Sequence, residues 1–266
     1  MPSFPRISED AFSTPCPCPV FFGGVTSLFA GRGKHTAAIG AFSALAASVA
    51  GLAAVLEYFF LPASPTYIVL GSLPIGKVAL NMNGFCAVFL VPILLLVGLC
   101  ALYGMKNGDG ASAGKGVHTG AHWFFYHLLS GGMVLALVAH DGFLFLLAWE
   151  AMSIAPFFLI TLHDDGSATR SAAWTYLVAA HLGTLFLLAF FASLAAQNGG
   201  TFDFQLFLTG YEYQGTPNRL CFLFALIGFG AKFVLMPLHV WLPEAHPAAP
   251  SHVSALMSGA MVNLGI

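Results

Sequence analysis

Two residues of opposite charge stand within long apolar runs of this sequence. Glu150 lies in FLFLLAWEAMSIAPFFLI and Lys232 lies in FALIGFGAKFVLMPL. Placing one charge in hydrocarbon costs roughly 2.5–3.5 kcal/mol, so such a residue usually has a partner or a function. Burial disfavours the charged form of both groups. The two residues can therefore exchange protons near neutral pH, or they can form a structural ion pair that fixes two helices.

Two prolines follow Lys232 closely. We expect Pro237 and Pro243 to break the helix that carries the lysine. Pro237 lacks a backbone N–H and clashes with the carbonyl four residues earlier, at Phe233. That carbonyl can hold a water molecule or accept a hydrogen bond from the lysine. Non-helical backbone within the membrane is tolerated only where protein or a water-filled cavity surrounds it. The break therefore predicts a polar pathway through the membrane.

Histidines surround the same break. We expect His239 and His252 to take part in a proton relay with the two charged residues. His181, in the middle of an apolar run, and Asp141, near a helix end, have either a relay or a structural role. His246 precedes a proline, where a structural turn competes with proton handling. The spacing of His239, His246 and His252 matches no zinc pattern, and we expect no metal site.

The composition indicates a polytopic membrane protein. Of 266 residues, 58% are hydrophobic and 8% are charged, whereas soluble domains carry about 25% charged residues. The net charge of −2 comes with no basic patch, which argues against nucleic acid as a partner. We expect Cys86, Cys100 and Cys221 to pack as small apolar side chains. No glycine-rich phosphate loop or thiolate set is visible, so we expect no cofactor.

The apolar runs predict an all-α fold, a polytopic membrane helix bundle with one broken helix. A spanning helix needs about 20 apolar residues. Six such spans are predicted over residues 37–60, 80–103, 122–140, 143–162, 172–195 and 220–242, the last broken near its end. Residues 61–79 predict a short hairpin outside the bilayer. Residues 197–219 predict a polar loop, and residues 251–266 predict the start of another helix.

The basic residues predict an orientation. With alternating loops, one side of the membrane receives Arg32, Lys34, Lys106, Lys115 and Arg170, and the other receives Lys77 and Arg219. Cytoplasmic loops carry an excess of lysine and arginine. We therefore expect the first set to be cytoplasmic, in a multi-pass protein of the cell inner membrane.

Several segments resemble a known family. The run AKFVLMPLHVWLPEAHPAAPSHVSALMSG is similar to the signature of proton-conducting antiporter-like membrane subunits, and LAWEAMSIAPFFLI resembles their glutamate-bearing helix. This family includes membrane subunits of respiratory complex I, Mrp-type antiporters and membrane-bound hydrogenases. The segment HPAAPSHVSALMSG is most similar to the large subunit of formate-hydrogenlyase and hydrogenase-4 complexes. The resemblance extends from about Gly31 to Ile266.

The resemblance implies roles for particular residues. Glu150 takes the place of the glutamate that pairs with a lysine on the broken helix, and Lys232 takes the place of that lysine. His252 opens the next helix, so the three would form one half-channel of a proton pathway. Asn263 stands where the hydrogenase-type pattern usually carries a lysine. Asparagine binds water but carries no charge, so onward transfer through this position is weakened.

The resemblance also implies an architecture and a function. Residues 1–36 would form an N-terminal segment with a partial first helix, and residues 37–266 the N-terminal part of an antiporter-like domain without its second inverted repeat. The implied function is proton translocation within a hydrogenase or NADH:quinone oxidoreductase complex. Its partners would be lipid and the other membrane and peripheral subunits, which would hold the redox centres. The alternatives are an Mrp-type cation/proton antiporter subunit and a truncated, inactive fragment.

Overall fold

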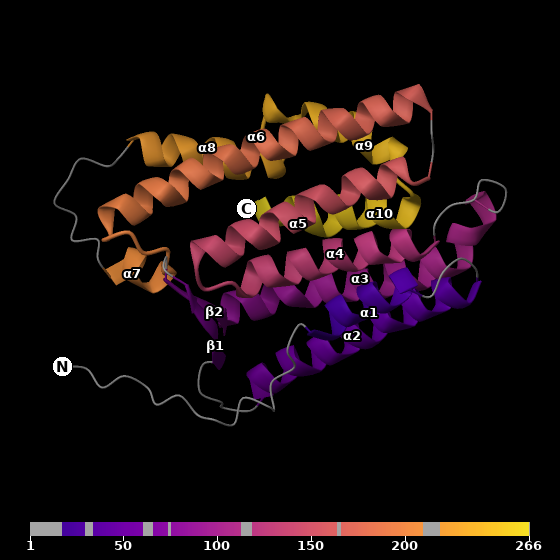
Figure 1. Cartoon of the computed structure of the whole chain (residues 1–266), viewed down its shortest axis with the longest axis horizontal. Coiled ribbons are helices and arrows are strands. Elements are labelled where there is room, and N and C mark those ends of the chain that lie inside the picture. Colours follow the sequence, from indigo (N-terminus) through magenta and orange to yellow (C-terminus); the bar gives the residue numbers. More distant parts are fainter. Residues whose placement is uncertain are drawn as a thin grey trace.

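The computed structural model describes residues 18–29, 34–60, 66–73, 76–112, 119–163, 166–209 and 219–265. Long helices lie side by side along the molecule, and β1, β2 and α7 lie at one end (Figure 1). The longer helices are α1 (Cys18–Phe29), α2 (Lys34–Phe60), α3 (Gly84–Ser112), α4 (Thr119–Val138), α5 (Gly142–Thr161), α6 (Ser167–Gln197) and α8 (Arg219–Lys232). The shorter elements are β1 (Thr66–Leu73), β2 (Gly76–Met82), α7 (Phe204–Thr209), η1 (Leu238–Trp241), α9 (Leu242–Ala248), α10 (Ser251–Leu256), η2 (Met257–Met261) and η3 (Val262–Gly265).

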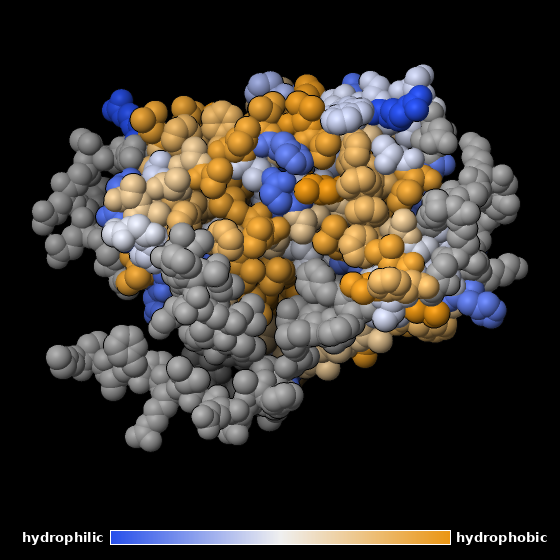
Figure 2. Space-filling model, in the orientation of Figure 1, coloured by the Kyte–Doolittle hydropathy of each residue, from blue (hydrophilic) through white to orange (hydrophobic). Residues whose placement is uncertain are grey.

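Helices α2 to α6 confirm the first five predicted spans. Each contains a stretch that is long and apolar enough to cross a membrane. Apolar side chains cover much of the described surface in Figure 2, and Phe42, Leu99 and Leu185 are among those exposed. A soluble monomer rarely exposes so large an apolar surface. The chain is therefore a multi-pass membrane protein with a helical bundle fold.

A hairpin is present where one was predicted, but it extends to Met82 and not only to residue 79. Strands β1 and β2 pair antiparallel, with Thr66 opposite Met82. The following helix consequently begins at Gly84 and not at residue 80. Backbone pairing explains the difference, because the Ala79 carbonyl accepts a hydrogen bond of 3.0 Å from the backbone N–H of His140. This bond holds β2 against the corner between α4 and α5.

The core of the bundle lies between α4, α5, α6 and the last short helices. Its fully buried side chains include Trp123, Tyr126, Met152 and Tyr176. Gly132 lets α4 approach the backbone of α5, because a Cβ atom at this position would lie 2.9 Å from the backbone nitrogen of Met152. The close approach fixes α5, the helix that carries Glu150.

Replacing Gly132 with leucine should destabilise the bundle. The added Cβ would press on backbone atoms of α5, 2.9 Å from the Met152 nitrogen and 3.0 Å from the Ala148 oxygen. Overpacking of this kind costs about 1–3 kcal/mol. Thermal unfolding of the protein in detergent should show a lower Tm. Gly84→Ala is the matched control, since its Cβ would lie 3.9 Å from the Tyr58 hydroxyl. An unchanged Tm for Gly132→Leu would contradict the close contact.

The sixth predicted span is broken earlier than its prolines indicated. Helix α8 ends at Lys232, and Val234 adopts a left-handed conformation with φ 65, which is strained for a β-branched residue. The effect of Pro237 extends toward the N-terminus, because its ring and missing N–H disrupt the preceding turn. Pro243, predicted as a second break, instead lies in the first turn of α9, where proline is tolerated.

Cysteine labelling should test the orientation of the helices. The C-terminal end of α3 and the start of α6 lie at one end of the bundle, opposite the end of α6 (Figure 1). Lys106 lies in the C-terminal part of α3, Arg170 in the first turn of α6, and Gln197 ends α6. We expect cysteines at positions 106 and 170 to react only from the cytoplasmic side, and a cysteine at position 197 only from the outside. Labelling of position 106 from outside intact cells would overturn this orientation. Lys115, also predicted to be cytoplasmic, lies outside the described residues.

Candidate functional site

Lys232 is buried within the bundle at the C-terminal end of α8. It is 3% exposed, and its ammonium nitrogen donates a hydrogen bond of 2.8 Å to the hydroxyl of Ser153 on α5. The same nitrogen lies 5.5 Å from the ring centroid of Trp149 and 5.9 Å from that of Tyr176. Aromatic faces and a helix C-terminus both attract a cation. Neutral groups thus stabilise the lysine at close range.

Ser153 can hold Lys232 in either protonation state. Its hydroxyl donates a hydrogen bond of 2.7 Å to the carbonyl of Trp149 while it accepts from the ammonium group. A hydroxyl group both donates and accepts, and it can rotate between partners. If Lys232 released a proton, the hydroxyl could donate to the neutral amine. The contact therefore permits proton release without loss of the side-chain position.

Trp241 satisfies part of the broken backbone beside Lys232. Its indole N–H donates a hydrogen bond of 2.9 Å to the carbonyl of Ala231. The ring is fully buried and meets Tyr176 edge-on, with centroids 5.1 Å apart. The Phe233 carbonyl was expected to hold a water molecule or to accept a hydrogen bond from Lys232, and the hydrogen bond of the ammonium group goes to Ser153. Trp241 and Ser153 thus supply hydrogen bonds to the polar groups at the helix break, which allows the break to be buried.

Glu150 lies beside His181, on the facing helix α6. The carboxylate oxygen Oε2 is 3.3 Å from Nε2 of His181. Nδ1 of the same ring lies 2.9 Å from the carbonyl of Leu177, so Nδ1 must carry a proton. Nε2 then faces the carboxyl group either as a second donor or as an acceptor of a carboxyl proton. A proton on Nε2 of His181 or on the carboxyl group would join the two side chains in a hydrogen bond.

Glu150 and Lys232 do not form an ion pair. Of the ion pairs between described residues, none joins these two, and Glu150 pairs with His181. Lys232 nevertheless contacts α5, the helix of Glu150, through its hydrogen bond to Ser153. The link between them runs along α5, since Ser153 is one helical turn from Glu150. The structure thus places His181, Glu150, Ser153 and Lys232 in one region.

The other predicted relay residues lie along the C-terminal segment. His239 lies in η1, and its buried Nδ1 has no hydrogen-bond partner among the described residues. His252 opens α10 and is 4% exposed. Asn263 is exposed, and its side-chain nitrogen donates a hydrogen bond of 2.9 Å back to the carbonyl of Gly259. The segment between them contains the π-helical turn η2, a deviation that is frequent at functional sites.

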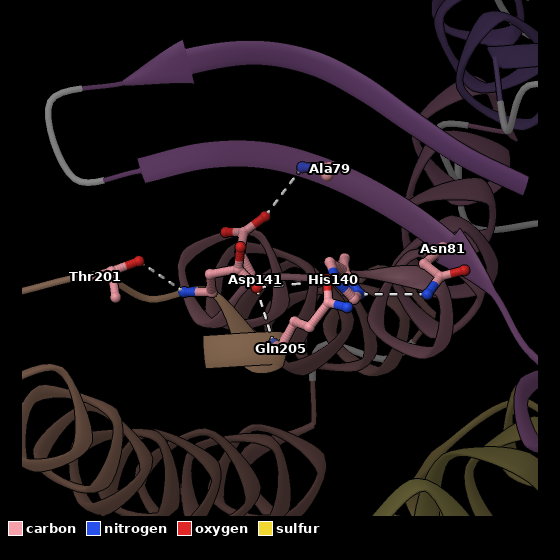
Figure 3. A network of polar contacts seen from close by, with 7 residues as sticks. Ala79, Asn81, His140, Asp141, Thr201 and Gln205 are labelled. Carbon is pink, nitrogen blue, oxygen red and sulfur yellow. Dashed lines mark hydrogen bonds and ion pairs between the residues drawn. The ribbon is translucent and has the colours of Figure 1, made fainter. Parts of the chain in front are cut away.

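Asp141 belongs to a separate polar network at the far end of α5 (Figure 3). Its carboxylate accepts hydrogen bonds from the backbone nitrogens of Leu144, at 2.8 Å, and Ala79, at 3.2 Å. It therefore acts as the N-cap of α5. The neighbouring His140 ring lies 3.8 Å from the carboxylate of Asp203, which precedes α7. Of the two roles expected for Asp141, this geometry favours the structural one.

Several residues of the site were not predicted from the sequence. Ser153 and Trp241 contact Lys232 or its helix, and His122 lies 2.9 Å from His252, Nε2 to Nε2. Ser153 could have been found from the sequence, because it is a polar residue one helical turn after Glu150 in an apolar run. The histidine contact joins positions far apart in the chain, and the sequence alone gives no sign of it.

Known proteins are similar to the part of the chain that carries this site. Residues 139–266 match a family described as "NADH:quinone oxidoreductase/Mrp antiporter, TM". This part of the chain is similar to that family. It contains Glu150, Lys232 and the broken helix, which is the region where the sequence resemblance was strongest.

Individual relatives and one solved structure extend the similarity. Hydrogenase-4 component B of Escherichia coli strain K12 is 38% identical over 194 residues, 72% of this chain and 28% of that protein. NAD(P)H-quinone oxidoreductase chain 4 of Synechococcus sp. strain WH7803 is 31% identical over 145 residues, 53% of this chain and 26% of that protein. A chain of the membrane-bound sulfane sulfur reductase, an archaeal respiratory membrane complex, shares the fold with a TM-score of 0.78 and 20% identity, over 94% of this chain and 51% of its own. The chain thus spans about a quarter of these two curated relatives.

Proposed function

We propose that this chain moves protons across a membrane as a subunit of a respiratory complex of the hydrogenase or NADH:quinone oxidoreductase type. The proposal rests on one observation above all: a buried lysine at the end of a broken helix whose close hydrogen-bond partner is a neutral serine. An uncompensated buried charge is expensive, so loss of the proton from Lys232 is readily driven by a change in nearby charge.

Glu150 and His181 supply that change in the proposed mechanism. When the shared proton leaves the pair, the carboxylate is left negative and stabilises the protonated Lys232. When a proton returns to the pair, the negative charge is neutralised and Lys232 releases its own proton. His239 and His252 exchange protons with Lys232 along the C-terminal segment. Each step moves one proton and requires no redox group in this chain.

The partners follow from the same reasoning. A proton relay of this kind needs an energy source, which we assign to redox subunits bound to this chain. The named complexes of the similar proteins, a hydrogenase and a quinone oxidoreductase, favour partners of those types. Membrane lipid would cover the exposed apolar helices. We place the complex in the cell inner membrane, where such redox reactions are coupled to a proton gradient.

Proton uptake by vesicles that contain the complete complex tests this function. Addition of the redox substrate should acidify or alkalise the vesicle lumen, and a protonophore should abolish the change. The signal should persist when sodium ions are replaced by choline. Sodium-driven proton exchange without any redox reaction would instead identify a cation/proton antiporter, the other activity named for the matched family.

A further inference from the structure

Three histidines meet where α4 begins, α5 ends and α10 begins. His122 and His252 are 6% and 4% exposed, and their Nε2 atoms lie 2.9 Å apart. His163 follows α5, and its ring centroid lies 4.8 Å from that of His122. His163 is partly exposed, whereas the other two are buried. The cluster therefore leads from the edge of the bundle toward its interior.

The distance between the two buried rings requires a proton between them. Two imidazole nitrogens at 2.9 Å form a hydrogen bond only when one carries a proton and the other presents a lone pair. Nδ1 of His122 is buried without a partner among the described residues. When Nε2 of His122 is the donor, its Nδ1 carries a lone pair and can accept a proton. His122 therefore has one nitrogen facing His252 and a second, buried nitrogen with no partner among the described residues.

The surroundings keep the pair in place. Gly104 on α3 leaves space for the His252 ring, because a Cβ there would lie 3.0 Å from its Cδ2 atom. The Tyr126 ring packs against His252, and its hydroxyl donates a hydrogen bond of 2.7 Å to the carbonyl of Val97. Rotation of the His252 side chain is thereby restricted.

His163 is suited to deliver protons to the pair. Its Nδ1 lies 3.1 Å from the carbonyl of Leu159, which makes Nδ1 the donor and leaves Nε2 to accept a proton. Burial lowers the pKa of His163, and the hydrogen bond to Leu159 opposes this effect. A proton bound at Nε2 is therefore held weakly and is readily passed on.

We propose that His122 and His252 share one proton and, with His163, form the port through which protons pass between the membrane surface and the buried relay. This inference rests on the proposed function. A proton from His163 or water binds Nδ1 of His122 and makes an imidazolium ion. The proton on Nε2 of His122 then moves to Nε2 of His252, and His252 releases the proton from its own Nδ1. The ring tautomers reset before the next proton arrives.

The path inward continues along the same helix. His252 begins α10, which leads into η2. There Met261 accepts a hydrogen bond of 3.7 Å from the hydroxyl of Tyr176, whose ring flanks Lys232. The port and the buried lysine are thus connected by one packed segment.

Two readouts test the port in the complete complex with 15N-labelled histidine. In the wild type, NMR should detect coupling between two Nε2 atoms across the shared proton, and His122→Gln should remove it. The matched control is His127→Gln, on the same helix, where the native ring bonds the Ser43 hydroxyl at 2.9 Å. The coupling should survive in this control. Redox-driven proton uptake should fall roughly tenfold or more in His122→Gln only, since a positioned proton-transfer group contributes 10²–10⁴-fold and water replaces part of it.

Chemical rescue separates a proton carrier from a structural residue. Free imidazole should restore part of the uptake lost in His122→Ala and should have no effect on His127→Ala. Absence of the coupling in the wild type would overturn the shared proton, whatever the uptake data show. Coupling together with normal uptake in His122→Gln would make the pair structural and overturn the port. If the Lys232 variants also took up protons normally, the proposed function itself would fail.

Discussion

Replacement of Lys232 with alanine should reduce redox-driven proton uptake by roughly 100-fold, the low end of what a positioned proton-transfer group contributes. The ammonium group is the buried acid of the proposed relay, and alanine cannot bind a proton. Membrane insertion should persist, because the change removes a charge whose insertion costs roughly 2.5–3.5 kcal/mol. The measurement is quenching of a pH-sensitive dye in vesicles that contain the complete complex.

Two further variants make this result specific. Lys232→Met keeps most of the side-chain volume, so it separates loss of the proton carrier from the cavity that alanine leaves. Lys106→Ala is the matched control, since Lys106 is exposed in the C-terminal part of α3. Normal uptake in Lys232→Met, with the complex fully assembled, would exclude Lys232 from the relay and leave it a structural cation held by Ser153.

Replacement of Glu150 with glutamine should also reduce proton uptake strongly, by at least roughly tenfold. Glutamine keeps the shape of the side chain but cannot exchange the proton that Glu150 shares with His181, 3.3 Å away. It also removes the negative charge that stabilises protonated Lys232. Uptake should be measured as for Lys232, with the amount of assembled complex determined in parallel.

Glu57→Gln is the matched control for this change. It removes the same charge from an exposed position near the end of α2. Glu150→Asp should retain part of the uptake, because the carboxyl group remains but is withdrawn from His181. Equal loss of uptake in the glutamine variants of Glu57 and Glu150 would show that the effect is not specific to the relay.

The sequence predicted the helices well, because their signal is local. Apolar runs of sufficient length predicted the five spans. Glycine, proline and β-branched residues predicted a hairpin over residues 61–79, and the strands lie within residues 66–82. The boundaries were less accurate. The helix after the hairpin begins at Gly84 because the preceding residues pair in β2, and such pairing depends on contacts with another part of the chain.

The charged residues of the site could be predicted from the sequence, but their contacts could not. Lys232 stood out because a cation in an apolar run is rare. Its partner Ser153 is 79 positions away in sequence, and the partner of His252 is 130 positions away. Packing of helices decides such pairs, and no local pattern encodes them. For the same reason the sequence paired Glu150 directly with Lys232, whereas the nearest charged partner of the carboxylate is His181.

The number of protons taken up per electron pair tests the central claim most directly. It should be measured in the same vesicles as electron transfer, for the wild-type complex and for the Lys232→Ala complex. The proposed relay predicts that the ratio falls in the variant while electron transfer continues or slows. An unchanged ratio at normal assembly would contradict the claim that protons cross the membrane through Lys232.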